Sequence, residues 1–423
     1  MRKTLLFGMG VSNKSAAEFL FQKNEDALFG YDDNINSFSN DKILPFLKKN
    51  VALLKNKNEI DNICFDRVIL SPGISLANPI VQKLKKKNVQ ILSEIELAVN
   101  IIKNNICIGI TGTNGKTTTS LLVCHILNNS NKKAVCLGNV GRPLTSYLND
   151  IKKDDILVIE LSSYQIDLLK RPFLDMALIL NISQDHLMRY GSFQKYAFSK
   201  LGISRILKKN GLFFVSKEIK ANYFLNLEKM KVVCFDDKKN LPKEKFISNT
   251  SSFLAAYGIC KKLYVSDKVC LQNYLSFHRP KYRLEFVAEI NGVCYYNDSK
   301  STNVESTLFA VDQMISAVIL LAGGDDKGLN YKKWNYAFLK KVKKVFAFGK
   351  SAKKIKADIP NIEVEIKKTL KAAVLAAFKI AEKNDAVLLS PGSSSFDMFK
   401  NFEHRGDEFI RIVSCLKRKG EYL

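Results

Sequence analysis

Several features that would place this 423-residue chain in another class of protein are missing from its sequence. It has no apolar run near the roughly 20 residues that a helix needs to cross a bilayer, so we expect no membrane insertion. None of its nine cysteines stands in a CxxC spacing, and its four histidines are widely dispersed. These absences count against a zinc site or a disulfide framework, and they favour reduced thiols in a cytoplasmic protein.

Arginine is also scarce, although the chain is strongly basic. The formal charge is +25, but only 11 of the 66 basic side chains are arginine. The surplus is +4 over residues 1–95, +13 over residues 96–280 and +8 over residues 281–423. Specific nucleic-acid readers usually depend on the arginine fork. Lysines that are spread over the whole chain therefore indicate a solvated surface before they indicate a nucleic-acid-binding site. We expect no nucleic-acid partner, and a basic, nucleic-acid-stimulated P-loop ATPase remains a minority alternative.

Short apolar strands alternate with amphipathic segments of helical length along the whole chain, which predicts an α/β protein with mostly parallel sheets. The apolar run at residues 4–7 breaks at two glycines, so we interpret it as a first strand rather than a signal segment. Further strands are predicted at residues 27–31, 67–70, 106–110, 156–159, 177–180, 318–321, 345–348 and 387–389. Helices are predicted at residues 15–22, 79–86 and 120–127, and the lysine runs at 85–87 and 340–344 are interpreted as solvated helix faces.

The first strand leads into a glycine-containing turn, GMGVSN at residues 8–13. The turn resembles a dinucleotide fingerprint in which Asn13 replaces the third glycine. A phosphate-bearing ligand at the N-terminus of the next helix is physically reasonable. A tight strand-to-helix turn without a ligand explains the local sequence equally well.

The strongest local signal is GITGTNGKTT at residues 109–118, between a predicted strand and a predicted helix. Small residues let backbone N–H groups surround a phosphate chain, while Lys116 neutralises it and the Thr117 hydroxyl can bind Mg²⁺. The spacing differs from the common P-loop, because Ile110 stands where the first glycine would fall. The strand–loop–helix context disfavours a chance glycine-rich turn.

Two later residues fit the same site. Glu160 ends an apolar strand, the usual place for a Mg²⁺ ligand beside a P-loop, although a strand-end carboxylate in water is the simpler alternative. His186 follows the next strand and is expected at the same carboxyl edge. A lone histidine there is more often structural, but beside the P-loop it becomes a candidate for a second metal or for substrate contact.

These segments together resemble the ATP-dependent Mur ligases of peptidoglycan synthesis, including the unusual spacing of the phosphate loop. Other segments follow in family order: ELSSYQ at 160–165, YAFSK at 196–200, NDSKSTN at 297–303, GGDDK at 323–327 and LSPGSSSFD at 389–397. The run FKNFEHRG at 399–406 resembles the D-glutamate-adding branch of the family. The DNPR signature of the diamino-acid-adding branch is absent.

The resemblance implies three domains: a UDP-binding Rossmann-like domain over residues 1–95, a central ATP-binding P-loop domain over 96–280, and a C-terminal Rossmann-like domain over 281–423 that receives the amino acid. It implies that ATP phosphorylates the carboxylate of UDP-N-acetylmuramoyl-L-alanine and that the amine of D-glutamate then displaces phosphate. We accordingly expect ATP and two Mg²⁺ ions as cofactors, and a cytoplasmic monomer.

The resemblance also assigns roles to individual residues. The expected catalytic residues are Lys116, Glu160, His186 and Lys200, and the expected metal ligands are Thr117, Glu160, His186 and a carbamylated Lys200. The expected ATP contacts are Gly112, Thr113, Asn114, Gly115, Lys116, Thr117, Thr118, Arg283, Asp298 and Lys300. The expected substrate contacts are Val11, Ser12, Gly73, Asn139, His186, Thr302, Lys327, Ser395 and the backbone of Phe402. The sequence by itself would make Lys200 an ordinary exposed helix lysine.

Four positions depart from the family pattern: Asn13, Met188, Ser252 and Tyr282. None of them lies in the phosphate loop or replaces an expected catalytic residue, so we expect an active enzyme with an altered KM for nucleotide. A ligase of the folylpolyglutamate synthetase type is a closer alternative. The nucleotide-domain pattern at the N-terminus and the segment at 399–406 count against it.

Overall fold

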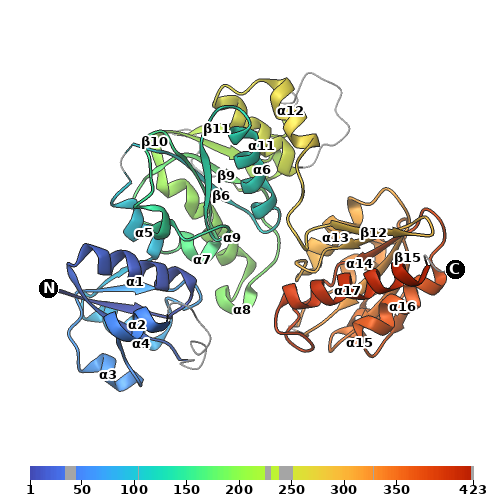
Figure 1. The fold of residues 1–423 in the computed structure, drawn as a ribbon, viewed down its shortest axis with the longest axis horizontal. Helices are drawn as coiled ribbons and strands as arrows, with labels where there is room; N and C mark the ends of the chain where they lie inside the picture. The colour runs from blue at the N-terminus through green and yellow to red at the C-terminus, as the bar shows by residue number, and fades with distance from the viewer. Residues whose placement is uncertain (34–43, 103, 224–229, 238–250, 327, 421–423) are drawn as a thin grey trace. The chain divides into compact units, whose positions relative to one another are not determined.

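The structure is a computed structural model that describes residues 1–33, 44–102, 104–223, 230–237, 251–326 and 328–420 (Figure 1). The chain forms two compact units, Met1–Phe277 and His278–Leu423. The first unit contains two sheets and the second contains one. The predicted α/β class with mostly parallel sheets is confirmed, whereas the domain limits at residues 95 and 280 stay predictions.

The first sheet has five parallel strands in the order β3-β2-β1-β4-β5. The strands are β1 (Arg2–Phe7), β2 (Asp26–Tyr31), β3 (Ala52–Leu53), β4 (Arg67–Leu70) and β5 (Gln90–Leu92). The helices are α1 (Val11–Lys23), α2 (Leu44–Asn50), α3 (Lys57–Asp61), α4 (Pro79–Lys86) and α5 (Glu94–Val99). Leu5 and Phe7 pack in one core cluster and Leu6 in another, because alternate strand residues face opposite sides of a sheet. Apolar packing therefore covers both faces, as parallel sheets require.

The turn between β1 and α1 is held by Asn13. Its side chain is buried, and Nδ2 donates towards three carbonyl oxygens, those of Phe7 at 3.1 Å, Gly8 at 2.8 Å and Ile69 at 2.9 Å. The amide therefore joins the ends of β1 and β4 at the position where a dinucleotide fingerprint has its third glycine.

The central sheet has six parallel strands in the order β11-β10-β9-β6-β8-β7. The strands are β6 (Ile106–Thr111), β7 (Ala134–Gly138), β8 (Ile156–Glu160), β9 (Leu174–Ile179), β10 (Leu207–Val215) and β11 (Lys231–Cys234). The helices are α6 (Lys116–Asn128), α7 (Ser163–Ile166), α8 (Leu187–Tyr190), α9 (Phe193–Leu201), α10 (Lys217–Asn222), α11 (Ser251–Lys262) and α12 (Asp267–Leu275), with 3₁₀ turns η2 (Leu144–Tyr147) and η3 (Gly202–Ile206). One core cluster contains both Leu6 of β1 and Leu157 of β8. A continuous apolar core thus joins the first two sheets into one unit.

The third sheet has the order β12-β13-β17-β14-β15-β16, with an antiparallel hairpin between β12 and β13 and parallel pairing elsewhere. The strands are β12 (Glu285–Ile290), β13 (Val293–Asn297), β14 (Val318–Gly323), β15 (Val342–Phe348), β16 (Val364–Ile366) and β17 (Ala386–Leu389). The helices are α13 (Val304–Asp312), α14 (Lys332–Ala337), α15 (Ala352–Asp358), α16 (Leu370–Ile380) and α17 (Phe402–Gly420). Leu320 of β14 shares a cluster with Trp334, and its neighbour Ile319 shares the other cluster with Phe409. This sheet is therefore also packed on both faces.

The prediction of a helix face for the lysine run at residues 340–344 is wrong, because Lys343 and Lys344 lie in β15. Lys344 Nζ contacts Glu363 at 2.6 Å and Glu365 at 3.1 Å, and the latter residue belongs to β16. Acidic partners that come from distant parts of the sequence neutralise the strand lysines. A local charge pattern in the sequence cannot predict partners of this kind.

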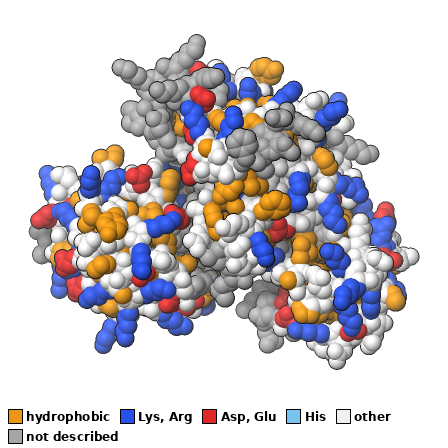
Figure 2. Space-filling model, turned by 180° about the vertical axis from the view of Figure 1, so that it is seen from behind, with side chains coloured by type: hydrophobic (Ala, Val, Ile, Leu, Met, Phe, Trp, Pro, Cys, Tyr) orange, Lys and Arg blue, Asp and Glu red, His pale blue; other side chains and the backbone are white. Residues whose placement is uncertain are grey.

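On the face shown in Figure 2, the basic side chains of the described residues are spread over the surface rather than gathered in one patch. Many of them pair with carboxylates, for example Lys208 with Asp175 at 2.9 Å. Within the described ranges, no helix is both long enough and apolar enough to span a bilayer.

A buried carboxyl group links α5 to the central part of the first unit. Glu94 Oε1 accepts hydrogen bonds from the backbone N–H of Thr145 at 2.6 Å and from its hydroxyl at 2.9 Å. The same hydroxyl lies 2.7 Å from Ser15 Oγ in α1. Burial raises the pKa of Glu94 to about 7, because the loss of water outweighs the hydrogen bonds that favour the carboxylate.

We predict that Glu94 makes the stability of the first unit depend on pH. Its pKa in the folded protein lies above the usual 4.5, so its contribution is fully present below about pH 4.5 and is lost as the pH rises through 7. Glu94→Gln keeps an acceptor oxygen and cannot ionise. In urea unfolding, the free energy of unfolding of the wild type should fall by up to about 3 kcal/mol more than that of the variant across this window. The exposed control Glu25→Gln should behave as the wild type, and parallel pH profiles for all three proteins would contradict the prediction.

Candidate active site

The phosphate loop joins β6 to α6 at the carboxyl edge of the central sheet. Gly112 has φ +156° and Gly115, the N-cap of α6, has φ +80°, which are conformations that favour glycine. The N–H of Thr113 donates to the carbonyl of Asn181 at 3.0 Å, and the N–H of Asn114 donates to the Asn181 side chain at 2.9 Å. The segment after β9 therefore fixes the loop in front of a helix N-terminus, a place suited to an anion.

Two lysine amines converge on one carbonyl oxygen of this loop. Lys116 Nζ and Lys200 Nζ each lie 2.8 Å from the oxygen of Gly112. Lys200 is only 2% exposed, and burial together with the charge of Lys116 holds its pKa well below the usual range. Lys200 is thus a buried amine that loses its proton readily, and not an ordinary surface lysine.

Glu160 ends β8 at the same edge and is 1% exposed. Its Oε1 accepts a hydrogen bond from Asn139 Nδ2 at 2.7 Å, while its buried Oε2 has no hydrogen-bond partner among the described residues. A buried carboxylate oxygen without a partner is unfavourable, and a hard divalent cation would satisfy it. Thr117 is buried in the first turn of α6 and supplies a hydroxyl. These donors fit Mg²⁺.

Carboxylates, imidazoles and thiols alone do not form a metal site here. No group of three or more His, Cys, Asp and Glu side chains in the described part of the chain is arranged to hold a metal ion. An ion at Glu160 would depend on other oxygen donors as well, such as hydroxyl, phosphate, water or carbamate. That requirement agrees with the preference of Mg²⁺ for oxygen ligands and retained water.

His186 directly precedes α8 and has a left-handed backbone with φ +53°. Its side chain is 46% exposed, and Nε2 lies 3.7 Å from a carboxylate oxygen of Asp185. The ring packs between Tyr164 and Tyr196, with centroid distances of 5.0 and 5.9 Å. Tyr196 OH lies 3.2 Å from Thr113 Oγ1 of the phosphate loop. Aromatic packing therefore holds a partly exposed imidazole close to that loop.

At the first sheet, the expected substrate residues lie at the start of α1 and on the loop that follows β4. Val11 and Ser12 open α1, and Val11 is 73% exposed. Gly73 follows β4, and a Cβ there would meet nothing within 4 Å. Asn139 lies instead against Glu160, to which its side-chain amide donates. Arg189 carries no signal in the sequence, yet its guanidinium donates to the carbonyls of residues 72–74 at 2.9–3.0 Å.

In the second unit, Asp298 is the buried centre of a polar cluster. Its carboxylate accepts hydrogen bonds from the hydroxyl of Ser390 at 2.8 Å and from the backbone N–H of Leu284 at 3.1 Å. Burial raises the pKa of Asp298 to about 6. The expected ATP residue Lys300 lies over the ring of Phe402, with Nζ 3.6 Å from the centroid. The structure thus brings Lys300 together with a residue expected to contact the amino acid.

A second residue that the sequence did not single out is Arg405, which is fully buried in this unit. It donates to the hydroxyl of Ser299 at 3.0 Å, to the carbonyl of Ser299 at 2.9 Å and to that of Ser393 at 3.0 Å. Burial lowers the pKa of Arg405 to about 10. Arg405 therefore links the segment at residues 297–303, which contains Thr302, to the segment at residues 389–397, which contains Ser395. Lys327, expected to contact the amino acid, lies outside the described residues.

The comparisons with known proteins agree with this architecture. Residues 110–262 match the Mur ligase middle domain, and residues 282–392 match the Mur ligase glutamate ligase domain. The chain is 39% identical to the UDP-N-acetylmuramoylalanine–D-glutamate ligase of Protochlamydia amoebophila over 98% of each chain, and 32% identical to that of a Thermoanaerobacter species over 99% of each. The chain belongs to the Mur ligase family.

The Mur ligase fold is also seen among solved structures. The MurF ligase of Thermotoga maritima in complex with ADP superposes with a TM-score of 0.60 at 15% identity, covering 93% of this chain and 95% of that one. At this identity the likeness shows the fold alone. Mur ligases are ATP-dependent enzymes, and the phosphate loop described above lies within the matched middle domain.

The structure places two of the positions at which a departure from the family pattern is expected. Ser252 lies beside the phosphate loop, since a Cβ on Gly115 would be 3.1 Å from its hydroxyl. Tyr282 has φ +62° and donates its OH to Asp407 at 2.7 Å, so the phenol is used to hold α17. The side chain of Met188 lies outside the described residues.

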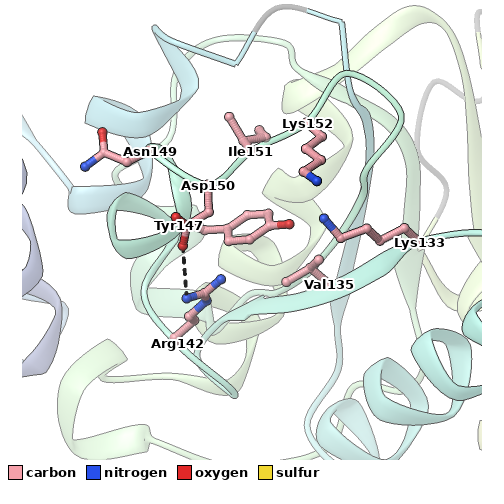
Figure 3. Close-up of a pocket in the computed structure, with 8 residues that line it drawn as sticks. All are labelled: Lys133, Val135, Arg142, Tyr147, Asn149, Asp150, Ile151 and Lys152. Carbon is pink, nitrogen blue, oxygen red and sulfur yellow. Dashed lines mark ion pairs between the residues drawn. The ribbon is translucent and has the colours of Figure 1, made fainter.

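A surface pocket of about 620 Å³ also occurs in the first unit (Figure 3). It is lined by Lys133, Val135, Arg142, Tyr147, Asn149, Asp150, Ile151 and Lys152. Lys133 precedes β7 and Lys152 precedes β8, so both lie towards the amino edge of the central sheet, whereas the phosphate loop lies at the carboxyl edge. This pocket is therefore separate from the candidate active site.

We predict that Glu160 is required for binding of Mg²⁺. Millimolar Mg²⁺ should raise the thermal midpoint of the first unit by about 2–4 °C, because the ion satisfies the lone Oε2 in the folded state only. Glu160→Gln keeps the side-chain size but removes the charge, so its midpoint should not respond. The exposed Glu218→Gln serves as control and should respond as the wild type does. An equal response of Glu160→Gln would show that the carboxylate is not a ligand.

Proposed function

We propose that this Mur ligase adds D-glutamate to UDP-N-acetylmuramoyl-L-alanine, with ATP converted to ADP and phosphate through an acyl-phosphate intermediate. The observation that carries the proposal is the 31–39% identity to ligases of that name along nearly the whole of both chains. The C-terminal match to the glutamate ligase domain supports it further. The polar groups of the site are those that the reaction needs.

The same proposal extends to the organisation of the enzyme. We assign UDP binding to the first sheet, over residues 1–95, ATP binding to the central sheet, over residues 96–280, and receipt of the amino acid to residues 281–423. Two observations on the described residues support Mg²⁺ held mainly by mixed oxygen donors: Oε2 of Glu160 has no hydrogen-bond partner, and no three His, Cys, Asp or Glu side chains are grouped to hold a metal. Two ions, a monomer and a cytoplasmic location complete the proposal.

The chemistry starts from a poor electrophile. A carboxylate resists attack by an amine until phosphorylation gives it a leaving group, and Mg²⁺ supplies neutralisation of charge on the phosphoryl oxygens. Lys116 and the N–H groups of the loop bind the phosphates, and Thr117 and Glu160 hold the ion. His186 orients the substrate or a second ion from the aromatic cluster. In the second unit, we assign Arg283, Asp298 and Lys300 to ATP, and Thr302, Lys327, Ser395 and the backbone of Phe402 to D-glutamate.

Lys200 is assigned a carbamate. Its amine is buried and holds its proton weakly, and a neutral amine can attack carbon dioxide. The nitrogen forms a new N–C bond while one C=O π bond of carbon dioxide opens, one proton leaves the nitrogen to solvent, and the neutral amine becomes an anion with two oxygen atoms. That anion would remove the repulsion with Lys116 and would offer Mg²⁺ the kind of ligand it prefers.

The proposed activity is tested by phosphate release and product analysis with ATP and UDP-N-acetylmuramoyl-L-alanine. D-Glutamate should give the dipeptide product, and L-glutamate, L-lysine and meso-diaminopimelate should not. Lys116→Ala should lower kcat by about 10²- to 10³-fold or more, because a charge that stabilises the phosphoryl oxygens is lost. A product with another amino acid in place of D-glutamate would refute the assignment of the branch, and normal turnover by Lys116→Ala would refute the role of the loop.

Carbamylation predicts a specific rescue. Lys200→Ala should be inactive, because the oxygen ligands are missing, and short carboxylic acids should restore part of the activity by replacing them. The matched control is Lys116→Ala, which should not respond to the same acids. If acids do not raise the kcat of Lys200→Ala above that control, the carbamate is not supported.

A further inference from the structure

Arg189 makes an unusual set of contacts in the first unit. Its NH1 donates to the carbonyls of Pro72 at 2.9 Å and Gly73 at 3.0 Å, and its NH2 donates to that of Ile74 at 3.0 Å. The two segments are 115–117 residues apart in the sequence. One guanidinium therefore binds three consecutive carbonyls of the loop that follows β4.

The guanidinium of Arg189 also lies over an aromatic ring. Arg189 Cζ lies 3.8 Å from the ring centroid of Tyr164, in α7, and the same ring lies 5.0 Å from the ring of His186. Tyr164 follows Glu160 by four residues in the sequence, and Arg189 follows His186 by three residues. Arg189 thus connects three segments, which carry Gly73, Glu160 and His186.

The geometry needs arginine specifically. A planar fork with several N–H donors can bind neighbouring carbonyls and stack on a ring at the same time, whereas an ammonium group is a compact point charge. In a trans peptide the C=O and the following N–H point in opposite directions. With the carbonyls of residues 72–74 turned towards Arg189, the N–H of exposed Gly73 is turned towards the other side of the loop.

We propose that Arg189 is a positioning residue. It fixes the position of the loop at residues 72–74 relative to His186 and Glu160. The inference rests on the proposed function, because it takes this loop to be in contact with the uridine-diphosphate half of the substrate. Arg189 contacts the loop and Tyr164 rather than reacting atoms. Its loss therefore acts on binding of the UDP-linked substrate far more than on ATP or D-glutamate.

The test compares Arg189→Lys, which keeps the charge, with Arg189→Met, which removes it. Arg411→Lys is the matched control, because it removes a two-pronged contact with Glu408 on the surface of the second unit. KM for UDP-N-acetylmuramoyl-L-alanine should rise about tenfold in Arg189→Lys and up to about a hundredfold in Arg189→Met. KM for ATP and for D-glutamate should change less than about twofold. Amide hydrogen exchange in residues 71–75 should become about tenfold faster in both variants.

The outcomes separate the inference from the proposed function. If Arg189→Lys keeps the wild-type KM for the UDP-linked substrate, or if all three KM values rise together, Arg189 does not position this loop and the inference fails. If the wild type itself does not ligate D-glutamate, the proposed function fails. In that case the positioning role is tested by the affinity for UDP, measured by calorimetry, and by the amide exchange rates of residues 71–75. If both are the same in Arg189→Lys as in the wild type, Arg189 does not position the loop.

Discussion

The contact on which the candidate site depends is the meeting of two lysine amines at the carbonyl oxygen of Gly112. Two ammonium groups cannot share one acceptor in a site of low dielectric without strong repulsion. Lys200 is the buried partner, and burial together with the charge of Lys116 holds its pKa well below the usual range. Burial of Lys200, in α9, against the phosphate loop therefore makes this amine lose its proton more readily than an ordinary lysine, next to the half-buried Lys116.

In each of the two units, loops that carry expected site residues are held by the same kind of contact. A side chain with several N–H donors reaches across the fold and binds backbone carbonyls of a distant turn. Asn13 does this for the first β–α turn, Arg189 for the turn after β4 and Arg405 for the segments of the second unit. Backbone carbonyls at the end of a parallel strand would otherwise need water or ligand. The loops are thus fixed before substrate binds, which lowers the entropy that binding must remove.

The sequence was sufficient for those features that depend on local pattern. Short apolar segments predicted three strands in each of the three sheets, and small residues followed by Lys116 predicted the phosphate loop. Burial of Lys200 and the contacts of Arg189 were not predictable, because both involve partners more than 80 residues away. The antiparallel hairpin of β12 and β13 also went unpredicted, although its turn carries a local signal: Asn291 and Gly292 have φ +51° and +76°, as a two-residue hairpin turn requires. The role of Lys200 came from resemblance alone.

Charged side chains cover β16, the strand at one edge of the third sheet. Glu365 within the strand contacts Lys344 of β15 and Lys367 just beyond the strand, and Glu363 contacts Lys344 as well. A strand from another molecule that added to this edge would have to remove water from these four groups. These paired charges therefore disfavour the addition of a further strand at the open edge of this sheet, and so they oppose edge-to-edge aggregation.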